Sequence, residues 1–189
     1  MLATFHILAL SGSLRAASIN SALLRATARL APPPITVEPF TGLGVLPLFN
    51  PDHEPAPPAP VLALRHAVAR ADALLIASPE YAHGVSGTIK NTLDWLVSFE
   101  PFVHKPVAVW NASPRAHHAD DALRETLRTM SAGIIEPASV SIPLLGAHLG
   151  EDGMVDSPAV SGTIVAALRA LHDAVAQGPE SPGPSFRLG

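Results

Sequence analysis

The sequence predicts one α/β domain in which a mostly parallel sheet is covered by helices on both faces. Short apolar runs alternate along the chain with stretches of helical periodicity, and each run ends at a polar turn containing Gly, Ser or Pro. Hydrophobic residues make up 48% of the 189 residues, which is enough for a substantial core. We expect the domain to span residues 1–177, and residues 178–189 to form a flexible tail.

The first half of the chain predicts three strands. An apolar run over residues 4–10 stops at Ser11-Gly12 and predicts the first strand. The next expected elements are a helix from Asn20 to the prolines at 32–34, a strand at Ile35–Pro39, a long irregular loop at 41–60 and a helix at 61–71. Ala73–Ala77 is the strongest apolar run and predicts the third strand.

The second half continues the alternation. Ile89, Leu93 and Leu96 lie at helical spacing and predict a helix at 88–97 that packs on the sheet. The remaining expected elements are a strand at 107–110, a helix at 120–130, a strand at 134–142 and a helix at 158–175. The expected product is a three-layer sandwich with a five-stranded parallel sheet in the order 2-1-3-4-5, in which ligands bind at the carboxyl ends of the strands.

The loop after the first strand has the composition of an anion site. Free backbone N–H groups and the helix dipole favour an anion where a strand leads into a helix. In the segment SGSLRAASIN, the hydroxyls of Ser11, Ser13 and Ser18 can donate to phosphate oxygens, and Arg15 adds a charge-assisted contact. Asn20 can donate or cap the helix. A simple helix cap with a solvated arginine explains the same residues equally well.

Several other kinds of site are disfavoured. The first loop lacks the Gly-Lys-Ser/Thr ending of a nucleotide-triphosphatase loop, the three spaced glycines of a dinucleotide fingerprint and the Gly-x-Ser-x-Gly of a hydrolase. The chain has no cysteine, so redox chemistry requires a bound cofactor. A net charge of −4 without basic runs predicts no nucleic-acid or membrane partner, and the start of the chain lacks a cationic signal region, so we expect a cytoplasmic protein.

The loops after the third and fourth strands are expected at the same sheet edge. In the second loop Tyr81 can lie along a planar ligand, Gly84 permits close approach of the backbone, and His83 is a weak candidate for a proton donor. In the third loop Arg115 could meet a nucleotide phosphate or simply be solvated. The nearby His117 and His118 suggest a metal, but adjacent histidines in a strand point to opposite faces, so no metal site is expected.

In the first and second loops, the sequence resembles the NADPH-dependent FMN reductase family, which includes quinone, chromate and azo-dye reductases. The resemblance rests on SGSLRAASIN followed by SPEYAHGVSGTIKNTLDWL and covers residue 5 to about residue 175. It implies a flavodoxin-like fold, noncovalent FMN, a homodimer or homotetramer, and hydride transfer from NADPH or NADH. The residues expected to bind the cofactor are Ser11, Ser13, Leu14, Arg15, Ser18, Asn20, Pro79, Glu80, Tyr81, Ala82, His83, Gly84, Ser113 and Arg115.

Three features of the second loop qualify the resemblance. Many members of the family have Asn where this chain has Ala82, and Pro where it has Ser86, so a ring-contacting side chain and a rigid turn are missing. In the family Glu80 can contact the flavin or join an ion pair between subunits, and the sequence does not choose between these roles.

The resemblance implies an enzyme that passes hydride from NAD(P)H through FMN to a small acceptor such as a quinone, free flavin or azo compound. No protein acid or base is required, because the flavin carries the chemistry. One alternative is a flavodoxin-type electron carrier without NAD(P)H-oxidising activity, although such carriers are expected to have a densely charged surface. A flavin-free binding protein of the same fold is another.

Overall fold

A computed structural model of the chain describes residues 3–113, 115, 117–144 and 146–178. Its central sheet consists of β1 (Phe5–Ser11), β2 (Ile35–Pro39), β3 (Ala73–Ala77), β6 (Pro106–Trp110) and β7 (Gly133–Ile134). All neighbouring strands are parallel, in the order β2-β1-β3-β6-β7. This order confirms the predicted 2-1-3-4-5 arrangement, because β4 and β5 form a separate hairpin outside the sheet.

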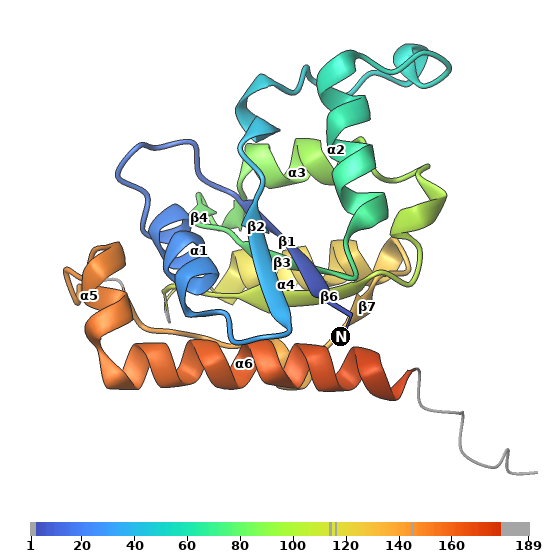
Figure 1. Cartoon of the computed structure of the whole chain (residues 1–189). Helices are drawn as coiled ribbons and strands as arrows, with labels where there is room; N and C mark the ends of the chain where they lie inside the picture. Colours follow the sequence, from blue (N-terminus) through green and yellow to red (C-terminus); the bar gives the residue numbers. More distant parts are fainter. Residues whose placement is uncertain (1–2, 114, 116, 145, 179–189) are drawn as a thin grey trace, which may run out of the picture.

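Helices cover both faces of the sheet (Figure 1). They are α1 (Ile19–Leu30), α2 (Ala59–Arg70), α3 (Gly87–Asp94), α4 (His117–Thr129), α5 (Glu151–Asp156) and α6 (Pro158–Gln177). Helices α1, α5 and α6 pack with one side of the sheet into a hydrophobic cluster, and α2, α3 and α4 pack with the other side. The structure is therefore the predicted three-layer sandwich.

Strand β1 shows why the buried strands of this sheet appear in the sequence as continuous apolar runs. Ile7 and Ala9 point into the α1 and α6 cluster, whereas Leu8 and Leu10 point into the α2 and α3 cluster. All four side chains are buried. Because successive residues of a strand face opposite sides, a sheet covered on both faces needs apolar residues at every position. Each buried Leu or Ile side chain contributes roughly 1.5–3 kcal/mol.

Two serine caps fix where helices begin near the carboxyl edge of the sheet. Ser18 Oγ accepts a hydrogen bond from Ser21 N at 3.2 Å at the start of α1. Ser86 Oγ accepts one from Ile89 N at 3.3 Å at the start of α3. Where the family resemblance implies a proline, Ser86 thus satisfies a free N–H group of the first helical turn.

Some elements differ from the sequence predictions. The final strand, expected over 134–142, is limited to β7 and an isolated bridge between Asn111 and Ser141, because Pro137 lies in a 3₁₀ turn at Glu136–Ala138 that interrupts the pairing. The loop at 41–60 contains two 3₁₀ helices, Gly42–Val45 and Pro51–His53. The β4–β5 hairpin and α5 were not predicted.

Helix α6 is long and apolar enough to cross a membrane by length and composition alone. In the structure it lies along the sheet beside α1 and α5 (Figure 1). Its Ile164, Leu168 and Leu171 side chains are buried in the core. It is therefore a packing helix of this domain. The tail predicted at 178–189 lies outside the described residues beyond Gly178.

Candidate functional site

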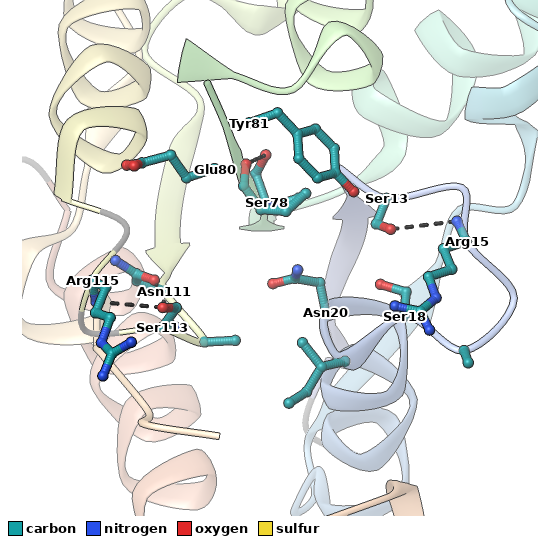
Figure 2. A pocket seen from close by; sticks show the side chains of 14 residues that line it. Ser13, Arg15, Ser18, Asn20, Ser78, Glu80, Tyr81, Asn111, Ser113 and Arg115 are labelled. Atoms are coloured by element: carbon teal, nitrogen blue, oxygen red, sulfur yellow. Dashed lines mark hydrogen bonds between the residues drawn. The ribbon is translucent and has the colours of Figure 1, made fainter. Parts of the chain in front are cut away.

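A cavity of about 440 Å³ lies at the carboxyl edge of the sheet, where the loops after β1, β3 and β6 meet. Figure 2 shows side chains from the three loops surrounding a common space. The lining residues are Ser13, Arg15, Ala17, Ser18, Ile19, Asn20, Ser78, Pro79, Glu80, Tyr81, Asn111, Ala112, Ser113 and Arg115. This is where ligands bind in open parallel sheets, at the point where the strand order reverses.

A close approach of the first two loops forms the floor of this region. Gly12 N donates a hydrogen bond to Ala77 O at 2.8 Å, which continues the pairing of β1 with β3. A Cβ atom at Gly12 would lie 2.3 Å from Ser78 Oγ and 2.9 Å from Ile89 Cγ1. Only glycine therefore fits here without displacing the second loop.

The serines of the first loop divide into two roles. Ser11 Oγ lies 2.8 Å from Ser21 Oγ of α1, so this hydroxyl braces the loop and does not line the cavity. Ser13 and Ser18 are buried and line the cavity. Ser13 Oγ accepts a long hydrogen bond from Arg15 N at 3.4 Å, and a hydroxyl that accepts from the backbone still has its proton to donate.

Asn20 carries the clearest sign of a missing ligand. Its side chain reaches from the first turn of α1 into the space between the loops (Figure 2). The residue is 4% exposed, and its Oδ1 atom has no hydrogen-bond partner among the described residues. A buried polar atom without a partner costs about 1–3 kcal/mol. A bound group with hydroxyls and phosphate oxygens would satisfy this amide, whose two ends donate and accept.

The charged residues that line the cavity are Arg15, Arg115 and Glu80, so its cations outnumber its one carboxylate and favour an anion. Arg15 and Arg115 line it from opposite loops, both exposed, and neither guanidinium forms an ion pair within the part of the chain that the structure describes. The first turn of α1 adds the positive end of a helix dipole and contains no acidic residue. The residues present thus fit the phosphate and polar chain of FMN.

The second loop is a tight hairpin of β4 (Glu80–Tyr81) and β5 (Gly84–Val85). Its two turn residues, Ala82 and His83, have φ values of 50° and 57°. Positive φ at both central residues is typical of a type I′ turn, in which Asn and Gly are favoured and other residues are strained. Asparagine, which the family resemblance implies at position 82, would therefore suit this backbone conformation better than alanine.

Only part of this hairpin reaches the cavity. Tyr81 lines it and is 58% exposed, and Figure 2 shows its ring extending toward Ser13. His83, the expected proton donor, does not line the cavity but stacks on His118 of α4, with ring centroids 4.4 Å apart and an interplanar angle of 29°. The structure therefore does not bring His83 to the ligand space.

Glu80 links the second loop to the third. Its backbone belongs to β4, and its side chain turns toward α4, where Oε2 accepts a hydrogen bond from Ala119 N at 2.9 Å (Figure 2). In the third loop, Asn111 Oδ1 accepts from Ser113 N at 2.8 Å, and Ser113 Oγ accepts from Arg115 N at 3.4 Å. The two bonds within the third loop brace its turn, and the bond at Glu80 ties the second loop to the start of α4.

The cavity contains most, but not all, of the residues expected to bind a cofactor. Ser11 and Leu14 line a neighbouring cavity of about 300 Å³ on the other side of the first loop, and Ala82, His83 and Gly84 line neither. Ser78 and Asn111 line the main cavity and were not among the expected residues. Each directly follows a predicted strand, and that position was the available signal.

The argument against a metal site treated His117 and His118 as residues of a strand, and this placement was wrong. Both lie in the first turn of α4, not in a strand or loop, and their rings are 4.1 Å apart. Across residues 3–178, leaving out the three undescribed positions in that range, no group of three His, Cys, Asp or Glu side chains could hold a metal ion.

The comparison with known proteins agrees with this geometry. The family model for NADPH-dependent FMN reductase matches residues 5–145, which include all three loops. The chain belongs to the NADPH-dependent FMN reductase family. Among its relatives, an NAD(P)H-dependent FMN reductase of Pseudomonas aeruginosa is 40% identical over 111 residues, covering 57% of this chain and 59% of the relative. A quinone reductase of Escherichia coli is 34% identical over 112 residues, covering 57% and 60%.

The similarity to these curated relatives thus spans about 60% of their length. A solved structure extends it across the fold: FerB of Paracoccus denitrificans, a flavoenzyme NAD(P)H:acceptor oxidoreductase, has a TM-score of 0.78 and 25% identity, covering 92% of this chain and 98% of FerB. The predicted family and the flavodoxin-like fold are confirmed.

Proposed function

We propose that this protein is an FMN-dependent NAD(P)H oxidoreductase that reduces a small acceptor, with a quinone as the first class to test. The Oδ1 atom of Asn20 carries the proposal, because it is buried, has no hydrogen-bond partner among the described residues, and belongs to the first turn of α1 beside a cavity that Arg15 and Arg115 line. The names of the relatives, which are reductases of FMN and quinones, support the same activity.

Residues of the three loops would divide the binding of FMN between them. Ser13, Arg15, Ser18 and Asn20 would hold the phosphate and the polar chain, because they surround the start of α1. Pro79, Tyr81 and the backbone of the second loop would flank the ring, and Ser113 and Arg115 would close the opposite side. Bound FMN supplies the hydride chemistry, accepting from nicotinamide and donating to the acceptor.

The protein's own contribution is position and electrostatics. Exposed N–H groups near a flavin ring stabilise negative charge on it, and Arg15 and Arg115 keep the site positive toward phosphate-bearing ligands. Tyr81 leaves a half-open rim through which nicotinamide and acceptor could enter in turn. No proton donor is required of His83.

We further propose that residues 1–177 act as one flavin-binding domain in a cytoplasmic homodimer or homotetramer without nucleic-acid or membrane partners. Charged residues make up only 15% of the chain, and several large apolar side chains are exposed in the first loop and in the segment that follows β2, among them Leu14, Val45 and Leu48. Leu14 lies against Gly44, so the first loop and the Gly42–Val45 turn form a continuous surface that a second subunit would cover.

Steady-state kinetics test the proposed reaction. The flavin-loaded protein is assayed with NADPH or NADH against 1,4-benzoquinone at several fixed concentrations of each. If the nicotinamide cofactor and the acceptor occupy one site in turn, the double-reciprocal plots should show parallel lines. Failure to oxidise either nicotinamide cofactor with quinone, free flavin or azo acceptors would refute the enzyme proposal, and rapid exchange with protein partners alone would indicate an electron carrier.

A further inference from the structure

Two contacts tie the second loop to the start of α4, and neither is explained by flavin contact. The first is the hydrogen bond from Ala119 N to Glu80 Oε2 at 2.9 Å. The second is the stacking of His83 on His118. Both link the hairpin to the first turn of α4, so they join the second loop to the helix that directly follows the third loop.

The bond at Glu80 has the chemistry of a helix cap. Ala119 is the third residue of α4, and its N–H is one of the donors that a helix start leaves free. A carboxylate is favoured at this end of the helix dipole, and the bond is charge-assisted. The carboxylate that caps α4 therefore comes from a separate loop, 39 residues earlier in the chain.

We infer that Glu80 is a positioning residue, whose carboxylate caps α4 and thereby holds the third loop, with Ser113 and Arg115, against the cofactor cavity. This role rests on the proposed flavin site, and it differs from both roles that the family resemblance implies for Glu80. The positive φ of Ala82 and His83 turns the hairpin back toward α4, and the His83–His118 stack acts as a second tie.

The first test needs no flavin. Amide hydrogen exchange of Ala119 is measured in the flavin-free full chain for the wild type, Glu80→Ala and Glu80→Gln. Losing a cap typically changes local opening roughly fivefold, so E80A should exchange about that much faster at Ala119. E80Q keeps an acceptor oxygen and should restore most of the protection. Unchanged exchange in E80A would overturn the inference, whatever the protein's activity.

The second test measures FMN dissociation constants by fluorescence in the same proteins. E80A should bind FMN roughly fivefold more weakly, because the third loop is no longer held. E80Q should lie much nearer the wild type. Weaker FMN binding by E80A without faster exchange at Ala119 would separate the effect from the cap, as in an ion pair between subunits, and would overturn the positioning role.

A matched control is Glu136→Ala. Glu136 also contacts α4, through Arg124 at 2.7 Å and Arg128 at 3.4 Å, but from outside the cavity. E136A should leave both Ala119 exchange and FMN binding unchanged. His118→Ala, which removes the stack on His83 together with the ring contact to His117, should change both in the direction of E80A and by less. An effect of E136A equal to that of E80A would reduce Glu80 to a general stabiliser of α4 and refute the inference.

Discussion

Replacing Asn20 with leucine should make the flavin-free protein more stable and the flavin complex weaker. The two side chains have nearly the same shape, so Asn20→Leu removes the unpartnered Oδ1 without opening a cavity. A buried unsatisfied polar group costs about 1–3 kcal/mol. For a chain of this size each kcal/mol shifts the unfolding temperature by roughly 2–4 °C, so the expected rise is roughly 2–12 °C.

The assay pairs thermal unfolding of the flavin-free protein with FMN titration of the same sample. N20L should bind FMN at least roughly tenfold more weakly, because the amide then neither donates nor accepts. The matched control is Thr27→Val, in the same helix. Thr27 is fully buried like Asn20, but its Oγ1 donates to Leu23 O at 2.8 Å, so no unsatisfied group is removed. T27V should show no stability gain and no change in FMN affinity.

Either of two results for N20L would refute this reasoning. A fall in the unfolding temperature of N20L would mean that the amide is already satisfied in the flavin-free protein. Unchanged FMN affinity would mean that Asn20 is a structural residue at the start of α1 and not part of the cofactor site.

Three further predictions concern other parts of the chain. Ala82→Asn should raise the free energy of unfolding by about 1 kcal/mol, because asparagine tolerates positive φ. The control is Ala56→Asn, in an exposed bend without positive φ, which should not raise it. Chemical denaturation measures both variants. The hydrogen bond from Arg25 holds the pKa of Glu151 below its ordinary value of 4.5, so Glu151→Gln should destabilise the protein at pH 7, and the difference from wild type should fade as the pH falls below 4.5. If the Arg115 guanidinium contacts the additional phosphate of NADPH, Arg115→Ala should raise the KM for NADPH roughly tenfold and leave the KM for NADH unchanged. Equal effects on the two KM values would contradict that contact.

The sheet was predictable because burial on both faces produces an unmistakable pattern. The runs over residues 7–10 of β1 and 73–77 of β3 are apolar at every position, and a serine follows each run. The β4–β5 hairpin lacked such a pattern, because its strands have two residues each and its turn carries Ala82 and His83 where Asn and Gly would signal a type I′ turn. The last strand was overestimated because an apolar stretch does not reveal where Pro137 breaks the pairing.

The site was predictable to the level of loops but not of every side chain. Parallel topology alone brings residues 11–20, 78–86 and 111–115 to one edge, whichever residues they contain. Which way a side chain turns depends on partners distant in the sequence: Glu80 turns to Ala119, and Ser11 turns to Ser21. The unsatisfied state of Asn20 likewise becomes visible only when every neighbour is in place.

One measurement tests the central claim most directly. The purified full chain is mixed with FMN, freed of excess, and its flavin absorbance is recorded under argon before and after addition of NADPH. The account predicts retained yellow colour that bleaches rapidly. Retained colour without bleaching by NADPH or NADH would contradict the reductase, and a protein that retains no flavin would contradict the cofactor site itself.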